Sequence, residues 1–300
     1  MASKEFLDYQ TAMAEQAAAN PPPEFKSEQE RREHIDKMLS QRPLAEGVVA
    51  KEIVANGVHT IGLAPEGVAE NAPGICYFHG GGYRIGSARA WQHFGSHLAV
   101  AGNCHVLLVD YRLAPENVFP AAVDDATSAY SWLVSNVPSE RIVLAGDSAG
   151  GGLAPALYLA ARDKGLPLPA GCACLSPWSD LTNSGESFTS NAGTDMMFSK
   201  EMADDAAASY LGSEDPRNPY ASPVFGDWTG LGPLLIHAGS TEVLLDDAAN
   251  LADAARKAGV DVRHRVFEAM PHVWHHGYPN FPEAVEAVEE IADFVNEVTS

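Results

Sequence analysis

Short apolar runs alternate along this chain with longer segments whose apolar positions repeat at helical spacing. The apolar runs have the length of buried strands and lie near residues 48–54, 58–63, 74–79, 104–110, 141–146, 170–176, 233–238 and 261–267. Helical patterns follow most of these runs, which is typical of a parallel sheet covered by helices. We therefore expect an α/β fold with one mostly parallel, eight-stranded sheet, helices on both faces, and chemistry at the carboxyl ends of the strands.

Two segments fall outside this alternation, residues 1 to about 45 and residues 183 to about 217. The run Pro21-Pro22-Pro23 divides the first segment into two helical pieces, and residues 199–211 of the second predict one short helix. The final predicted helix, about 280–298, carries an apolar stripe opposite a run of acidic residues. We interpret that acidic run as the solvated face of the helix.

A serine flanked by glycines follows the fifth apolar run. The segment Gly146-Asp147-Ser148-Ala149-Gly150-Gly151 has the G-x-S-x-G pattern of a nucleophile elbow, in which a strand turns directly into a helix. The turn forces strained backbone angles on the serine, and the glycines leave room for it. At the helix N-terminus, free N–H groups and the helix dipole favour negative charge. A glycine-rich turn without chemistry is the alternative, so partner residues decide.

A glycine-rich loop follows the third apolar run at His79-Gly80-Gly81-Gly82. Successive glycines expose backbone N–H groups, and in an esterase such a loop supplies part of the oxyanion hole. A flexible loop or a phosphate cradle is the competing interpretation. However, the loop lacks the Lys-Ser/Thr ending of a P-loop and the spacing of a dinucleotide-binding fingerprint. Together with the serine turn, it favours an oxyanion hole.

His272 is the candidate general base, because in this kind of hydrolase the base follows the serine along the chain. It lies between the last predicted strand and the last predicted helix, and His275 and His276 are fallback candidates. His237 falls inside a strand-like run and is expected in the core, whereas His264 alternates with apolar positions on a strand surface. Three close histidines also suggest a metal site, but no Asp, Glu or Cys ligand pattern accompanies them.

Glu242 is the candidate acid, since it is the first carboxylate after the strand that ends near Ala238. A triad acid accepts the second N–H of the histidine and fixes its tautomer. Asp246 and Asp247 follow one turn later and open a helical pattern, where they suit a helix cap and a first-turn acid. Asp246 stays open as an alternative acid.

These segments resemble the bacterial hormone-sensitive-lipase-like family of α/β-hydrolases, esterases with an H-G-G-G loop and a G-D-S-A-G-G elbow. Asp110-Tyr111-Arg112-Leu113-Ala114-Pro115-Glu116 is similar to the D-Y-R-L-A-P-E segment of the family, and residues 119–125 and 176–181 resemble further family segments. The resemblance extends over roughly residues 75–277. It implies the α/β-hydrolase fold.

The resemblance also implies roles for individual residues. Ser148 would be the nucleophile, His272 the base, and the N–H groups of Gly81, Gly82 and Ala149 the oxyanion hole. The chain departs from the family at the acid, because Glu242 stands where the family usually has an aspartate in a D-P-L-x-D-E segment. Either carboxylate can serve chemically, although the longer glutamate needs a different backbone placement.

In this family, regions outside the sheet pattern pack together as a cap over the active site. We therefore expect residues 1–45 to form the N-terminal part of a small helical cap, residues 46–300 the catalytic domain, and residues 183–217 a further part of the cap. A small, partly polar cap restricts the acyl chain, so short-chain acyl esters are the expected substrates. The family often pairs through its last strand and helix, which makes a homodimer a further hypothesis.

The resulting hypothesis is a serine carboxylesterase that acts on small-molecule esters through a Ser-His-Glu triad and an acyl-enzyme, and that needs no cofactor or metal. A lactonase or an amide-directed hydrolase would use the same triad. A non-catalytic ligand-binding module on a hydrolase scaffold is the alternative from another class, and the presence of both Ser148 and His272 argues against it.

The composition of the chain indicates which binding partners and which cellular compartment to expect. A chain of 300 residues with 46% hydrophobic content can bury the core of one α/β domain. Its net charge of −21 argues against nucleic acid and anionic membranes as partners and disfavours strongly anionic substrates. No apolar stretch approaches the length of a bilayer span, and the first ten residues lack the pattern of a signal peptide. Buried cysteines at 76, 104, 172 and 174, with Cys172 and Cys174 on one strand face, fit the reducing cytoplasm.

Overall fold

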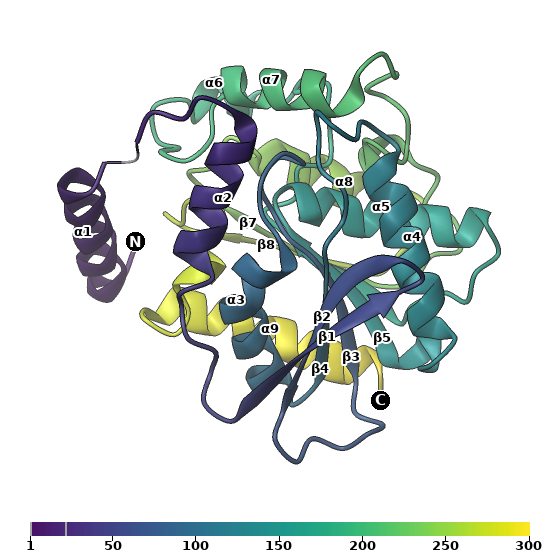
Figure 1. The fold of residues 1–300 in the computed structure, drawn as a ribbon. Helices are drawn as coiled ribbons and strands as arrows, with labels where there is room; N and C mark the ends of the chain where they lie inside the picture. Colours follow the sequence, from purple (N-terminus) through teal and green to yellow (C-terminus); the bar gives the residue numbers. More distant parts are fainter. Residues whose placement is uncertain (1, 22) are drawn as a thin grey trace.

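The computed structural model of the chain describes residues 2–21 and 23–300. Within these residues the chain forms one eight-stranded sheet with the order β1-β2-β4-β3-β5-β6-β7-β8 (Figure 1). The strands are Val48–Ala55 (β1), Val58–Pro65 (β2), Gly74–Phe78 (β3), His105–Val109 (β4), Ile142–Asp147 (β5), Gly171–Leu175 (β6), Leu234–Gly239 (β7) and Val262–Phe267 (β8). β2 pairs antiparallel with β1 and β4, and the other pairings are parallel. The predicted sheet is confirmed.

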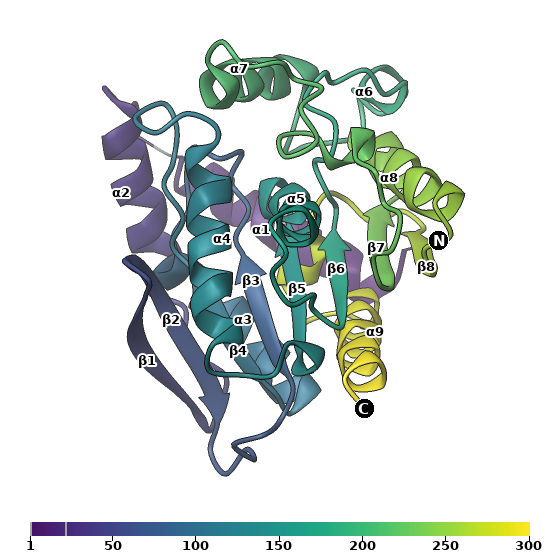
Figure 2. The same cartoon turned by 90° about the vertical axis from the view of Figure 1, so that its right-hand side faces the viewer.

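Helices cover both faces of this sheet, as predicted, and others lie outside it. They are Lys4–Ala19 (α1), Glu28–Leu39 (α2), Ala88–Gly102 (α3), Ala121–Val134 (α4), Ala149–Asp163 (α5), Ser187–Ser190 (α6), Lys200–Leu211 (α7), Leu245–Lys257 (α8) and Pro282–Val298 (α9). Short 3-10 turns span Ser139–Arg141, Pro223–Phe225 and Trp274–Gly277. Helices α3 and α9 pack on one face of the sheet, and α4, α5 and α8 pack on the other (Figures 1 and 2).

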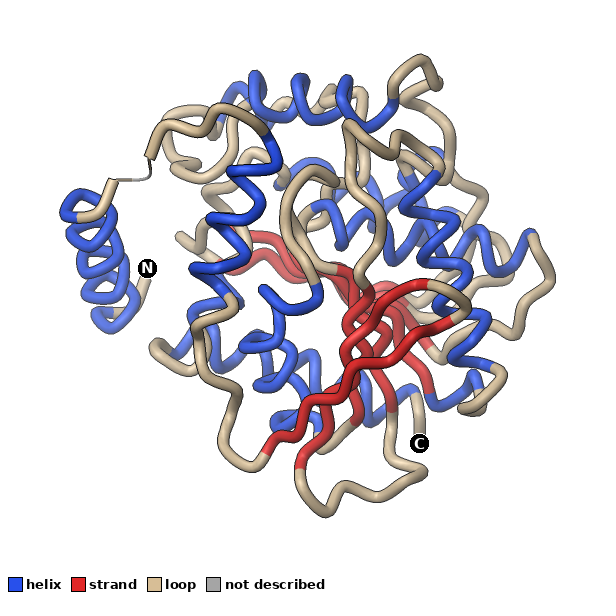
Figure 3. The backbone as a smooth tube through the Cα atoms, viewed as in Figure 1, coloured by secondary structure: helices blue, strands red, loops and turns tan. Residues whose placement is uncertain are grey.

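Alternate residues of each central strand belong to two separate cores, because successive side chains point to opposite faces. In β3, Ile75 and Tyr77 pack with residues of α3 and α9, whereas Cys76 and Phe78 pack with residues of α4 and α5. Helices bury both faces of the sheet, so these strands are apolar throughout. This is why continuous apolar runs mark the central strands in the sequence. Figure 3 shows the strands gathered at the centre of the molecule with helices around them.

The four cysteines are buried and free, as expected. Cys172 Sγ and Cys174 Sγ lie 3.7 Å apart, which confirms that both thiols point to one face of β6. Burial raises the pKa of the Cys76 thiol to about 12. These cysteines therefore act as small packing residues.

The segments outside the sheet lie near the carboxyl ends of the strands. The arrowheads of β5 and β6 point toward α6 and α7 in Figure 2. α7 confirms the helix predicted over 199–211, and Ser199 Oγ accepts the N–H of Met202 at its start (3.3 Å). Of the predicted proline break, Pro22 lies outside the described residues, and α1 and α2 lie on either side of it. No helix among the described residues is long and apolar enough to cross a bilayer.

Candidate active site

Ser148 lies at the turn between β5 and α5. Its φ of 55° and ψ of −120° are angles that residues with a side chain rarely adopt. Three backbone hydrogen bonds hold it there: the Ser148 N–H donates to Leu175 O (2.9 Å), and Ser148 O accepts from the N–H groups of Gly152 (3.1 Å) and Trp178 (2.9 Å). The nucleophile candidate therefore has a fixed backbone position.

The elbow glycines allow α5 to pack directly on the sheet. A Cβ on Gly150 would lie 2.0 Å from Phe78 O, and a Cβ on Gly146 would lie 2.3 Å from Gly150 O. Neither glycine has a positive φ. Their requirement comes from the close approach of the helix to β3, so larger residues would push Ser148 out of place.

His272 joins Ser148 to Glu242 by hydrogen bonds. His272 Nε2 lies 2.9 Å from Ser148 Oγ, and His272 Nδ1 lies 2.6 Å from Glu242 Oε2. Glu242 is fully buried, and its Oε1 accepts the N–H of Gly239 at the end of β7 (2.7 Å). Burial lowers the pKa of His272, but the hydrogen bond and charge of Glu242 outweigh burial and raise the pKa above the ordinary 6.5. The structure thus brings together the three residues predicted as a triad.

The fallback histidines have other partners. His275 is fully buried, and its Nε2 lies 3.2 Å from His237 Nδ1. His276 Nε2 lies 3.3 Å from Asp147 Oδ2. His237 is buried in the core, as expected. Of the histidines after β8, His272 is the one within hydrogen-bond distance of the Ser148 hydroxyl.

Asp246 and Asp247 serve the neighbouring loops. Both lie in the first turn of α8, but the N-cap is Leu244, so the expected helix cap is wrong. Asp246 Oδ2 accepts an N–H at the start of α6 (2.8 Å). The buried Asp247 Oδ2 accepts the N–H groups of Ser179 (2.9 Å) and Asp180 (2.8 Å). Their carboxylates therefore hold segments of the chain against α8.

The glycine loop presents backbone N–H groups beside Ser148. Gly81 has a φ of 116°, and a Cβ there would lie 2.2 Å from Ile85 O, so this position requires glycine. Within the described part of the chain, the N–H groups of Gly81 and Gly82 donate to no acceptor. Ala149 is the first residue of α5, where helical N–H groups have no partner inside the helix. These donors are free to bind an oxyanion.

Asp147 links the serine turn to the glycine loop, a role that the sequence analysis missed. Its buried Oδ1 accepts from Tyr77 Oη (2.7 Å), Trp91 Nε1 (2.8 Å) and the Gly80 N–H (3.1 Å). Burial raises the pKa of Asp147, but the charge of His276 and the hydrogen bonds from Tyr77 and Trp91 outweigh burial and lower the pKa below its ordinary value. Tyr77 and Trp91 lie 70 and 56 residues away in sequence, so no local pattern indicates the contact.

A cavity of about 940 Å³ opens onto Ser148 and His272. Its lining is mostly apolar and comes from α1, α2, the glycine loop and the segment 183–217, for example Phe6 and Met197. The Phe198 ring lies nearly parallel to the His272 ring, with centroids 6.0 Å apart. Chain segments far apart in the sequence therefore enclose the serine hydroxyl.

Arg84, two residues after the glycine loop, is paired with two of these segments. Its guanidinium forms ion pairs with Glu28 in α2 and Asp205 in α7. Arg32 in α2 donates in turn to the carbonyl oxygen of Arg84 (2.5 Å). The segment after the loop, α2 and α7 are thus joined at Arg84, a contact that no local sequence pattern indicates.

The arrangement supplies a nucleophile, a base oriented by a carboxylate, and free N–H donors, which together suit acyl transfer. Among the described residues, no group of three or more His, Cys, Asp or Glu side chains is placed to hold a metal ion.

Known proteins resemble the chain over most of its length. The family model described as "alpha/beta hydrolase fold" matches residues 75–276. An acetyl-hydrolase of Streptomyces hygroscopicus is 46% identical over 226 residues, which cover 75% of this chain and 76% of that protein. The crystal structure of an esterase from the bacterial hormone-sensitive lipase family is 42% identical with a TM-score of 0.93, over 100% of both chains. The crystal structure of EstE5 soaked with p-nitrophenyl butyrate is 36% identical with a TM-score of 0.91, over 99% of both chains.

Proposed function

The chain belongs to the bacterial hormone-sensitive-lipase-like family of α/β-hydrolase esterases, and on this premise we propose that it hydrolyses short-chain acyl esters through Ser148, His272 and Glu242. One observation carries the proposal. Ser148 Oγ, the two ring nitrogens of His272 and Glu242 Oε2 form a continuous series of hydrogen bonds beside the cavity. An intact series of this kind favours an esterase over a binding module that has lost its chemistry.

His272 acts first as a base and then as an acid. It takes the hydroxyl proton of Ser148 as Oγ attacks the ester carbonyl, and Glu242 stabilises the imidazolium that forms. The imidazolium then gives its proton to the leaving alcohol, and the acyl group stays on Ser148. Water activated by the same histidine hydrolyses the acyl-enzyme and restores the serine.

The oxyanion of each tetrahedral intermediate is bound by the N–H groups of Gly81, Gly82 and Ala149. Their freedom from other acceptors supports this assignment. A helix N-terminus at Ala149 adds a favourable dipole.

Residues 1–45 and 183–217 act as a cap on a catalytic domain of residues 46–300. The lining of the cavity and the ion pairs of Arg84 with α2 and α7 support this division. A cap of this kind excludes water from the acyl-enzyme and limits the acyl chain. Preference for short chains agrees with the name of the acetyl-hydrolase relative and with the p-nitrophenyl butyrate soaked into EstE5 crystals.

A homodimer through β8 and α9 and a cytoplasmic location complete the proposal. In the sheet of the described residues β8 pairs with β7 alone, and an open strand edge can pair with a second copy. The buried free cysteines support a reducing compartment. Light scattering on purified protein tests the dimer, and a monomer at every concentration would refute it.

The central test is the variant Ser148→Ala. We expect it to lose about 10⁵- to 10⁶-fold in kcat on p-nitrophenyl butyrate and to resist labelling by a fluorophosphonate probe, while its circular dichroism stays that of the wild type. Ser128→Ala on the exposed side of α4 is the matched control and should keep both activity and labelling. Labelling of Ser148→Ala at the wild-type rate would contradict the assignment.

A further inference from the structure

Arg42 is an arginine in the active-site cavity that has no carboxylate partner among the described residues. Other arginines form ion pairs, for instance Arg112 with Asp125 and Arg84 with Asp205. Arg42 Nη2 donates one long hydrogen bond to the carbonyl oxygen of His276 (3.4 Å). Burial lowers the pKa of the Arg42 guanidinium, yet arginine stays charged at neutral pH. A half-buried positive charge therefore faces the cavity uncompensated.

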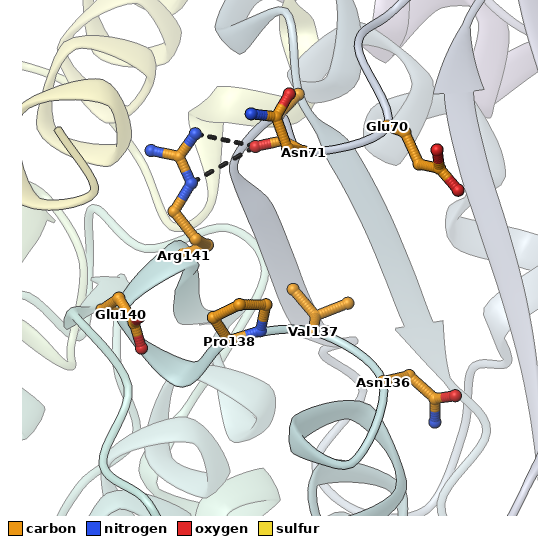
Figure 4. Close-up of a pocket in the computed structure, with 8 residues that line it drawn as sticks. Glu70, Asn71, Asn136, Val137, Pro138, Glu140 and Arg141 are labelled. Atoms are coloured by element: carbon orange, nitrogen blue, oxygen red, sulfur yellow. Dashed lines mark hydrogen bonds between the residues drawn. The ribbon is translucent and has the colours of Figure 1, made fainter.

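Arg141 also has no carboxylate partner, but the donors of its guanidinium are hydrogen-bonded to backbone carbonyl oxygens. It lines a separate cavity between the loops that precede β3 and β5 (Figure 4). Its Nε and Nη2 donate to Asn71 O (3.2 and 2.7 Å), and its Nη1 donates to Thr299 O (2.5 Å). Carbonyl oxygens thus occupy its guanidinium, whereas most donors of Arg42 have no acceptor in the described part of the chain.

Two histidines lie close to Arg42. His93 Nδ1 lies 2.5 Å from the carbonyl oxygen of Pro43, next to Arg42, and the His97 ring lies 4.7 Å from the His93 ring. Burial lowers the pKa of His97 to about 4, and the charges of His93 and Arg42 act in the same direction. Tyr9 in α1 lines the same cavity as Arg42. These groups leave the positive charge without a local counter-charge.

The carboxylates in the described lining of the cavity are already engaged. Asp147 binds Tyr77, Trp91 and Gly80, and Asp205 pairs with Arg84. Neither is available to neutralise Arg42. This part of the cavity is positive even though the whole chain carries −21.

We propose that Arg42 binds a negatively charged group of the substrate, so that the preferred ester carries a carboxylate on its acyl or its alcohol portion. The inference rests on the proposed esterase function and specifies its substrate class. A guanidinium matches a carboxylate with two parallel hydrogen bonds, and Arg42 has the donors free for them. Arg42 is bonded to His276, whose ring lies beside Asp147, the residue before the nucleophile.

The net charge of the chain leads to the opposite expectation, that strongly anionic substrates are disfavoured. That repulsion acts over long distances and is screened beyond about 8 Å at physiological ionic strength. A guanidinium in direct contact with the bound substrate is screened much less. Local charge therefore governs binding, and net charge affects mainly the rate of encounter.

Two pairs of esters that differ in one charge test the inference. In the first pair, 4-acetoxybenzoate and its methyl ester, the charge lies on the alcohol portion. In the second, p-nitrophenyl hydrogen glutarate and its methyl ester, it lies on the acyl portion. We expect Arg42→Met to lower kcat/KM about 10- to 100-fold for the charged member of one pair and to leave both neutral esters within about threefold. The pair that responds shows whether the carboxylate lies on the acyl or the alcohol portion of the preferred ester.

Two further variants serve as controls. Arg42→Lys should recover part of the loss, because it restores the charge without the two-pronged geometry. Arg217→Met removes an arginine that packs over the Phe225 ring away from the cavity lining, and should leave all four esters unchanged. An equal loss on charged and neutral esters, or no loss on either, would overturn the inference.

A measurement on the wild type keeps the inference testable if the variants fold poorly. Benzoate should inhibit hydrolysis of p-nitrophenyl butyrate at least tenfold more strongly than benzamide, and the difference should shrink as salt rises. Equal inhibition by the two would refute a carboxylate site. Neutral-ester hydrolysis by the wild type separates the two ideas, since its absence would refute the esterase proposal itself.

Discussion

The variant Asp147→Ala should damage stability and turnover together, because one buried oxygen serves three donors. Oδ1 accepts from the Tyr77 hydroxyl (2.7 Å), the Trp91 indole (2.8 Å) and the Gly80 N–H (3.1 Å). A buried donor left unpaired costs about 1–3 kcal/mol, so the three together cost about 3–9 kcal/mol. Water that enters the vacated space satisfies part of this demand, and we expect a net loss of about 3–5 kcal/mol in the free energy of unfolding.

Turnover should fall because Asp147 holds Gly80, the residue before the proposed oxyanion donors. Misplacing one such donor costs about 10²- to 10³-fold in kcat. Asp147→Asn is the matched variant, since it keeps an acceptor of the same shape and removes the charge. We expect Asn to lose less than tenfold in kcat. Urea unfolding followed by fluorescence and initial rates on p-nitrophenyl butyrate measure both effects.

The pH dependence separates charge from hydrogen bonding at this position. The pKa of Asp147 is lower in the folded protein than its ordinary value, so its contribution to stability is present above about pH 3.9 and is lost as pH falls through the folded pKa. Asp147→Asn should therefore lose less stability than the wild type on acidification. The reasoning would be refuted by an Asp147→Ala protein within 1 kcal/mol and threefold in kcat of the wild type.

Three further results are expected. Glu242→Gln should lower kcat about 10³- to 10⁴-fold, because an amide cannot stabilise the imidazolium. The kcat of Asp246→Asn should stay within about threefold of the wild type. The reverse order of effects would make Asp246 the acid. The kcat/KM of the wild type should rise with pH as His272 loses its proton, with a midpoint above 6.5. Glu242→Gln should move this midpoint to lower pH, because burial then lowers the pKa of His272 with no carboxylate to raise it. An unchanged midpoint would contradict this. Arg84→Met should raise KM and broaden the acyl-chain profile on p-nitrophenyl esters from acetate to decanoate, and an unchanged profile would show that the ion pairs do not hold the cap.

The proposed catalytic residues could be predicted because each of them follows closely after the end of a strand. Apolar runs mark β5, β7 and β8, and Ser148, Glu242 and His272 come shortly after them. Since parallel strands end at the same edge of a sheet, chain order is enough to bring these residues together. The structure adds the distances between their atoms.

Contacts between distant residues could not be predicted in the same way. Nothing in the sequence around Asp147 distinguishes it from any other residue of the elbow. Its partners Tyr77 and Trp91 lie in other elements. At α8, local rules favour an aspartate as the helix cap. Tertiary hydrogen bonds instead engage Asp246 and Asp247, and the helix begins without a side-chain cap. The preference for a capping aspartate therefore gave the wrong prediction here, because the aspartates accept hydrogen bonds from neighbouring segments instead.

The backbone of Ser148 implies that this position is not optimised for folding. Angles of 55° and −120° suit glycine, and holding a residue with a side chain there costs about 1–3 kcal/mol. The hydrogen bonds that Ser148 forms with Leu175, Gly152 and Trp178 must offset that cost in every folded molecule. Stability and the proposed activity therefore place opposing demands on Ser148, and selection for thermal resistance alone would favour replacing this serine.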